Sequence, residues 1–250
     1  MTAAGAPGVV LSRALREATA RAAREDRADG IDRPGVAARA DADAVVRRLG
    51  PTAYDATWRA MQSFTADRNA ASADEIWLTE HPPVYTLGLA GRREHLLRDN
   101  GIPLVKVDRG GQITYHGPGQ LVVYVLVDLT RRRLGVRALV RTLESCVIEF
   151  LETCGVSAHT RAGAPGVYVA RPTGEAKIAA LGLKIKNGRS YHGLALNIDM
   201  DLTPFADIDP CGYPGLAVTQ LKDLGVRRSV EDAGCVLAPM LASSLPARSS

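Results

Sequence analysis

The spacing of apolar residues along the chain predicts a mixed α/β fold. Apolar positions recur at helical intervals over residues 53–70 and 135–154, and Gly155 supplies a stop signal for the second helix. A third, short helix is expected around residues 230–241, and residues 204–215, rich in Pro and Gly, should be irregular. The positions that repeat in the first helix are Tyr54, Trp58, Met61 and Thr65.

Between these helices, apolar runs predict β-strands. Residues 75–89 give two strand pieces on either side of His81-Pro82-Pro83, and residues 121–129 are apolar at nearly every position. A strand that is apolar on both faces is buried on both faces, so residues 121–129 should lie inside a sheet. The side chains of the first two strands that we expect in a core are those of Trp77, Leu78, Val84 and Leu87.

Asn187-Gly188 stands between two apolar runs and predicts a β-hairpin with a two-residue turn. Counting outward from such a turn predicts the pairs Lys186–Arg189, Gly182–Gly193 and Ala180–Ala195. The glycine and alanine pairs share one face, where missing side chains would leave a narrow slot for a straight acyl chain. The spacing is equally compatible with small residues that only make room for a packed helix.

We expect residues 45–242 to form one catalytic domain, because 250 residues suffice for a single core. Residues 1–44 are rich in Ala, Arg and Asp and should form a mobile extension, and residues 243–250 a polar tail. An organelle transit peptide is the alternative for the extension, but its acidic residues argue against that. No membrane-spanning segment or signal peptide is recognisable, so the expected location is the cytoplasm.

Composition narrows the classes of function. The hydrophobic fraction of 46% and charged fraction of 23% are those of an ordinary globular protein. A formal net charge of +4, with basic and acidic residues interspersed, does not indicate nucleic-acid binding, although it would suit an acidic protein partner. The cysteines should be free thiols, and neither they nor the histidines have metal-ligand spacing. They are Cys146, Cys154, Cys211 and Cys235.

Two loops carry candidate chemistry. Arg109-Gly110-Gly111 opens a glycine-rich loop whose backbone could approach a ligand closely, with Arg109 as a charge for a carboxylate or phosphate. Taken alone, this pattern also fits simple turns and a solvated arginine. Cys211 lies in Asp209-Pro210-Cys211-Gly212, a rigid and polar loop that is unusual for a core cysteine. The other three cysteines lie at or near helical segments, where a cysteine usually acts as a small hydrophobe.

A nucleophilic thiol needs a partner that lowers its pKa or accepts its proton. Lys177, at the open end of the hairpin, could do both if burial lowered its own pKa, although a lysine at a strand end is ordinarily solvated. A histidine is the alternative base, and spacing does not choose among the candidates. These are His81, His116 and His192.

Three long motifs resemble the lipoyl(octanoyl) transferase family of lipoate biosynthesis. They are RGGQITYHGPGQLVVYVLVDL, GVYVA followed by KIAALGLKIKNGRSYHGLALNIDMDLTPFADIDPCGY, and TQL, within residues 54–225. The resemblance implies a fold like that of biotin and lipoate-protein ligases, with a mixed sheet and flanking helices. It also implies that Cys211 carries an acyl thioester and that Lys177 is its catalytic partner.

The resemblance further implies the substrates and the binding residues. The donor would be octanoyl-acyl carrier protein, and the acceptor a lysine of lipoyl domains of 2-oxoacid dehydrogenases or of glycine cleavage H protein. No metal or other cofactor is expected. The implied substrate-binding residues are Arg109, Gly110, Gly111, Gln112, Ile113, Thr114, Tyr115, His116, Ala180, Leu181, Gly182, Gly193, Leu194 and Ala195.

Two other hypotheses about the function have to be distinguished from an octanoyl transferase. An ATP-dependent lipoate-protein ligase would share the fold but would need no nucleophilic cysteine, so Cys211 argues against it. A non-catalytic protein that binds acyl carriers would have no use for the combination of Lys177 and Cys211.

Overall fold

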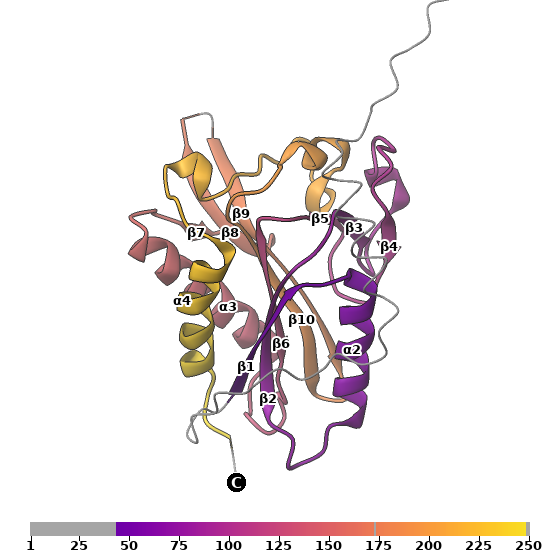
Figure 1. Ribbon diagram of the computed structural model, residues 1–250, viewed down its shortest axis with the longest axis vertical. Helices are drawn as coiled ribbons and strands as arrows, with labels where there is room; N and C mark the ends of the chain where they lie inside the picture. Colours follow the sequence, from indigo (N-terminus) through magenta and orange to yellow (C-terminus); the bar gives the residue numbers. More distant parts are fainter. Residues whose placement is uncertain (1–43, 173, 249–250) are drawn as a thin grey trace, which may run out of the picture. The chain divides into compact units, whose positions relative to one another are not determined.

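The computed structural model describes residues 44–172 and 174–248, so the predicted extension lies almost wholly outside the described residues. Figure 1 shows the arrangement of the elements. The helices are α2 (Tyr54–Asp67), α3 (Val136–Thr153) and α4 (Val230–Ser244). The strands are β1 (Ala44–Pro51), β2 (Asp74–Glu80), β3 (Val84–Leu87), β4 (Leu104–Lys106), β5 (Ile113–His116), β6 (Gln120–Leu126), β7 (His159–Thr160), β8 (Gly166–Arg171), β9 (Gly174–Lys186) and β10 (Arg189–Asn197). Short 3-10 turns are η1 (Arg93–His95), η2 (Thr203–Asp207), η3 (Pro210–Gly212) and η4 (Lys222–Leu224).

The strands form two sheets. The larger has the order β1-β2-β6-β10-β9-β8-β7, and it is mixed because β1 pairs with β2 in parallel while its other pairs are antiparallel. The smaller sheet has the order β4-β3-β5. The prediction of a mixed sheet with flanking helices is therefore confirmed.

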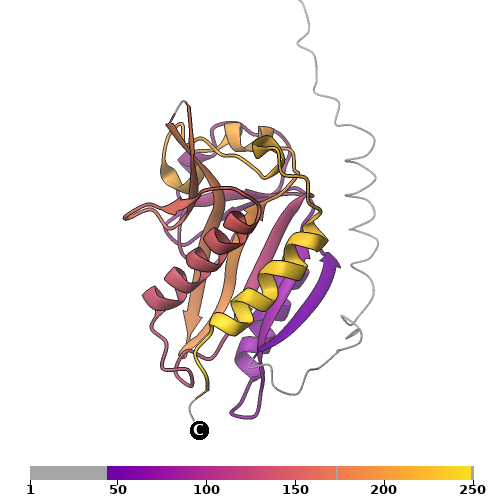
Figure 2. The ribbon, with the colours of Figure 1, turned by 90° about the vertical axis from the view of Figure 1, so that its left-hand side faces the viewer.

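Helices α3 and α4 lie side by side on one face of the large sheet (Figure 2). Leu139, Leu143 and Phe150 of α3 are buried there in one core cluster with Val167 of β8 and Ile178 of β9. The spacing of these apolar residues on α3 is the one that predicted the helix. Within the described ranges, each helix is too short or too polar to traverse a bilayer.

Helix α2 covers the opposite face, where Met61 packs with Val122, Tyr124 and Tyr191. Both faces of β6 are thus buried, as its continuous apolar run predicted. The helix ends three residues before the predicted boundary. Arg68 leaves the helical conformation and its buried guanidinium forms an ion pair with the buried carboxylate of Asp74.

The β9–β10 hairpin has the predicted register. Lys186 pairs with Arg189, and the glycine pair and the alanine pair also face each other as expected. On its outer side, β8 covers β9 only as far as the pair Gly166–Ala180. Farther along the same edge, the backbone N–H of Gly110 donates to the carbonyl of Leu183 at 2.9 Å, so this hydrogen bond ties the glycine-rich loop to the edge of the sheet.

The C-terminal helix extends farther than the predicted short helix. It runs to Ser244, and Leu245 beyond it is 6% exposed because it packs into the core between the sheet and helices α3 and α4. A hydrogen bond from Arg132 to the carbonyl of Pro246 holds the following residue. The first residues of the expected polar tail therefore belong to the packed structure.

Candidate active site

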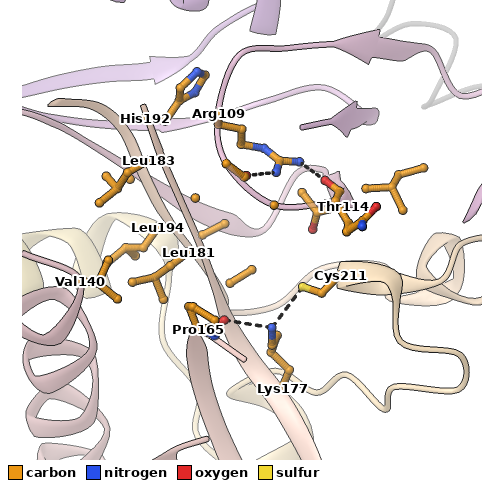
Figure 3. Close-up of a pocket in the computed structure, with 18 of the residues that line it drawn as sticks. Arg109, Thr114, Val140, Pro165, Lys177, Leu181, Leu183, His192, Leu194 and Cys211 are labelled. Atoms are coloured by element: carbon orange, nitrogen blue, oxygen red, sulfur yellow. Dashed lines mark hydrogen bonds between the residues drawn. The ribbon is translucent and has the colours of Figure 1, made fainter. Parts of the chain in front are cut away.

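A cavity of about 390 Å³ lies beside β9 and β10 (Figure 3). Both predicted catalytic residues, Lys177 and Cys211, line it. Every predicted substrate-binding residue lines it as well, except Tyr115. The ring of Tyr115 instead packs against Tyr85 and Phe205, at centroid distances of 5.6 and 5.5 Å.

The sulfur of Cys211 and the amine of Lys177 are in direct contact. Lys177 Nζ lies 3.1 Å from Cys211 Sγ and 3.1 Å from the carbonyl oxygen of Pro165 (Figure 3). The lysine is 3% exposed, and its amine lies 5.0 Å from the ring centroid of Tyr168. Hydrogen bonds thus direct a buried amine at the one half-buried thiol that is held in an irregular loop.

The pKa of Lys177 is raised, so the condition for a resting base, a pKa lowered by burial, is not met. Burial alone would lower it, but the negative charge of Cys211 and hydrogen bonds with Tyr168 and Cys211 outweigh the burial. The amine therefore stays protonated at neutral pH. In the resting pair, Lys177 is a proton donor and a positive charge beside the sulfur.

The turn that carries Cys211 is tight. Cys211 lies in η3 with φ 58° and ψ 15°, a left-handed conformation that is uncommon for a residue with a side chain. Gly212 follows with φ 74°, and its N–H donates to the carbonyl of Asp209 at 2.9 Å. Asp209 in turn is fixed by its N–H to the carbonyl of His95 at 2.9 Å. Two consecutive left-handed residues reverse the chain so that the thiol lines the cavity.

The loop of Cys211 is closed by the backbone of its own partner. The N–H of Lys177 donates to the carbonyl of Ala217 at 2.9 Å, and the N–H of Thr219 donates to the carbonyl of Lys177 at 3.0 Å. One residue therefore supplies both the amine and the main-chain anchor of the segment that follows the thiol.

Arg109 is a buried side chain, 8% exposed, and not a solvated surface charge. Its guanidinium donates to the carbonyl and hydroxyl of Thr86 at 2.7 and 2.8 Å, and to the carbonyls of Gly110 and Gln112. Burial lowers its pKa, and no ion pair joins it to another side chain of the described ranges. The cavity thus contains a second positive charge that is bound only to neutral acceptors.

The predicted slot at Gly182 and Gly193 is partly filled by neighbouring atoms. A Cβ on Gly182 would lie 3.1 Å from Arg109 Cδ and from the carbonyl oxygen of Gly110, and a Cβ on Gly193 would lie 2.0 Å from the carbonyl oxygen of Val123. The glycines therefore make room for the arginine loop and for the backbone of β6. The open space lies beside them, where Ala180 and Ala195 line the cavity.

The three histidines considered as alternative bases all lie away from the thiol's hydrogen bonds. Burial lowers the pKa of His81 to about 4, and that of His116 to about 3 with a contribution from His81, so both rings are neutral at neutral pH. His192 is bound to Asp108 at 3.0 Å. For the described residues, Lys177 is the recorded hydrogen-bond partner of Cys211 Sγ.

Asp108 is a feature of the site that the sequence analysis missed. Its carboxylate accepts hydrogen bonds from Trp58 at 2.9 Å, Gln62 at 3.2 Å, His192 at 3.0 Å and Tyr191. Burial alone would raise the pKa of this carboxyl, but the four donors lower it below its usual range. The sequence signal was its place directly before the Arg109-Gly110-Gly111 motif.

The remaining cysteines are free but differently placed. Cys146 is 1% exposed on the apolar face of α3, as its spacing predicted, Cys154 is half-buried, and Cys235 is exposed on α4. Among residues 44–172 and 174–248, no three His, Cys, Asp or Glu side chains gather in a way that could hold a metal ion.

The sequence of this chain is similar to those of known proteins of one family. The family described as "Lipoyl protein ligase A/B catalytic domain" matches residues 53–238. An octanoyltransferase of Thiobacillus denitrificans is 61% identical over 208 residues, covering 83% of this chain and 94% of that protein. One of Dechloromonas aromatica is 59% identical over 201 residues, covering 80% and 96%.

Among solved structures, lipoate-protein ligase A bound with ATP has a TM-score of 0.65 at 18% identity, with 82% of this chain and 87% of that chain covered. A bipartite lipoate protein ligase from Thermoplasma acidophilum has a TM-score of 0.63 at 18% identity, covering 82% and 86%. At such identities the likeness shows the fold alone. The expected ligase-like fold is confirmed.

The fold and the matched family thus define a class, the catalytic domain that lipoate-protein ligases and lipoyl transferases share. Within that class, identity of about 60% over most of the chain is decisive. The chain belongs to the octanoyltransferase family, and it is an acyltransferase of protein lipoylation.

Proposed function

We propose that this enzyme transfers an octanoyl group from octanoyl-acyl carrier protein to a lysine of a lipoyl domain through a thioester on Cys211. The acceptors are the lipoyl domains of 2-oxoacid dehydrogenases and glycine cleavage H protein. The observation that carries the proposal is the 3.1 Å contact between the thiol and a buried amine in a cavity large enough for an acyl chain. The four free thiols support a reducing compartment, the cytoplasm.

In the first half-reaction, the Cys211 thiolate attacks the carbonyl carbon of the donor thioester. The bond between that carbon and the carrier's sulfur breaks, and the Lys177 ammonium gives its proton to the departing thiolate. The raised pKa of Lys177 supports this role, because the proton is already on the amine. The products are the acyl-enzyme and a free carrier thiol.

In the second half-reaction, the neutral amine of the acceptor lysine attacks the Cys211 thioester. Lys177, now neutral, takes a proton from the attacking nitrogen, and Cys211 leaves as a thiolate when the amide forms. Only after both half-reactions is the pair back in its starting protonation state. Neither step calls for a nucleotide or a metal ion.

The negative oxygen of each tetrahedral intermediate needs donors. The N–H of Gly212 is occupied by the carbonyl of Asp209, and that of Gly110 by the carbonyl of Leu183. We therefore assign the oxyanion to the backbone N–H groups of Gly111 and Gln112, with the buried charge of Arg109 nearby.

The test is an intact-protein mass spectrum after incubation with octanoyl-acyl carrier protein in the absence of ATP. We expect a single octanoyl adduct on Cys211, and its transfer to a lipoyl domain when that domain is added. An absolute requirement for ATP, with no adduct, would favour the ligase reaction. Donor binding without adduct or product would favour a non-catalytic carrier-binding protein.

A further inference from the structure

Tyr191 and His192 are consecutive residues of β10, yet their side chains lie on the same face of the sheet. In a regular strand, successive side chains point to opposite faces. His192 has φ 61°, and this left-handed conformation turns its ring toward that of Tyr191. The two ring centroids are 5.1 Å apart with 25° between the planes, and both side chains bind Asp108.

The ring of His192, which lies on the face opposite to the one expected from its place in the strand, is held by several contacts. A left-handed conformation strains a residue that has a side chain, so it persists only where the surroundings impose it. Asp108 binds one nitrogen of the ring, Tyr191 stacks on it, and Tyr124 lies at a centroid distance of 6.2 Å. His192 is 2% exposed and lines the cavity. The ring is therefore a fixed part of the cavity wall.

This wall lies far from the reacting groups. Figure 3 shows His192 at the side of the cavity remote from Cys211 and Lys177, with Arg109 between them. Ala195, Gly193, Arg109 and His192 all line this cavity. An acyl chain that extends from Cys211 along β10, past the side chain of Arg109, would meet the ring of His192 at its far end.

Strand register gives the length of the path. A Cβ on Gly166 would lie 3.1 Å from Lys177 Nζ, and Gly166 pairs with Ala180, which pairs with Ala195. The reactive end is thus level with Ala195, and His192 lies three residues away, or about 10 Å along the strand. An octanoyl chain has seven carbon–carbon bonds of about 1.5 Å, which span roughly 9 Å in the staggered form.

We propose that His192 is a specificity-determining residue, the end wall that limits the acyl group on Cys211 to about eight carbons. Asp108 is the positioning residue that holds the ring in the path. This inference rests on the proposed thioester at Cys211 and adds what selects its chain length.

The test offers an equimolar mixture of hexanoyl-, octanoyl-, decanoyl- and dodecanoyl-acyl carrier protein and reads the adducts by intact mass. His192→Gly removes the ring but keeps the backbone conformation at no strain. We expect the ratio of decanoyl plus dodecanoyl to octanoyl adduct to rise roughly tenfold or more. The control Tyr191→Phe removes one hydrogen bond to Asp108 and leaves the wall in place, so its ratio should match that of the unaltered enzyme.

A thermal melt checks folding of each variant. If His192→Gly is unfolded, His192→Asn carries the test, because Asn tolerates the left-handed region and is shorter than His. A folded, acylated His192 variant with the unaltered preference for octanoyl overturns the end wall while leaving the thioester intact. Absence of any adduct on the unaltered enzyme overturns the proposed function and the end wall with it.

Discussion

The two ends of the cavity share a backbone device and use it differently. Each has a residue with a side chain in the left-handed conformation, followed by glycine: Cys211-Gly212 at one end and His192-Gly193 at the other. Cys211 is half-buried in a short turn, and its recorded hydrogen bond is to Lys177. His192 is almost fully buried and is bound to Asp108 and stacked on Tyr191.

The difference matches the two roles that we propose. A nucleophile that reacts with two protein-borne substrates in turn needs an accessible thiol, and Cys211 is half-buried in a short turn. An end wall needs a fixed ring, and the ring of His192 contacts Asp108, Tyr124 and Tyr191. The same left-handed conformation would thus present a reactive atom at one end and a boundary at the other.

Loss of the nucleophile should give the largest effect. Cys211→Ser replaces the thiol with a far weaker nucleophile, so we expect no octanoyl adduct and a fall in rate of at least about 10³-fold. The matched control is Cys235→Ser, since Cys235 is an exposed thiol on α4 and should retain full activity. A full-strength adduct on Cys211→Ser would place the nucleophile elsewhere.

Loss of the amine should come second. Lys177→Ala removes the proton donor and should lower the rate of acyl transfer by about 10²- to 10⁴-fold with donor binding largely retained. Single-turnover acylation and a binding titration would separate the two quantities. The control Lys222→Ala removes an exposed lysine that is paired with Asp199, and should change neither. Unchanged turnover of Lys177→Ala near pH 7 would remove the lysine from the mechanism.

The two glycines should separate stability from rate. Gly193→Ala forces a Cβ against the carbonyl oxygen of Val123 and should lower the free energy of unfolding by about 3 kcal/mol. Gly212→Ala has φ 74° against it and should cost about 1 kcal/mol, while lowering the acylation rate because the thiol turn shifts. Urea unfolding and single-turnover acylation measure the two effects. Equal losses of stability would contradict the difference between the two ends.

The last of the expected effects, on stability and its dependence on pH, is at Asp108. Asp108→Asn weakens the hydrogen bonds of a charged acceptor and should lower the free energy of unfolding by about 2 kcal/mol at pH 7. The lowered pKa of Asp108 makes its contribution complete above the ordinary value of 3.8, and the contribution is lost as pH falls through the lowered value. Unfolding measured against pH should therefore show a constant gap at neutral pH that narrows below about pH 4. A gap that does not change with pH would mean that the charge is irrelevant.

Local patterns predicted the regular part of the fold well. The helical spacing of α3 and the Asn187-Gly188 turn each follow from contacts within a few residues, so the helix and the hairpin register could be derived from the sequence. Strand β1 was missed, since Ala44–Pro51 includes Arg47 and Arg48 and has neither clean alternation nor a long apolar run. The end of α2 was missed because the ion pair of Arg68 with Asp74 is a tertiary contact.

The site was predictable only in part. Cys211 stood out by its loop. Lys177, at the open end of the hairpin, was one candidate partner beside three histidines, and the family resemblance then implied the lysine. The raised pKa of the lysine depends on the contact with sulfur, and the inversion of His192 depends on Asp108, more than 80 residues earlier in the chain. Neither the raised pKa nor the inverted side chain can be predicted from the spacing of nearby residues.

The clip between the backbone of Lys177 and residues 217–219 has an evolutionary consequence. Because the strand anchors the chain just after the thiol turn, the surface residues between the turn and the clip can accept substitution, and even a change in number, without altering the distance between sulfur and nitrogen. Selection on carrier recognition could therefore change that stretch while the sulfur of Cys211 and the amine of Lys177 keep their separation.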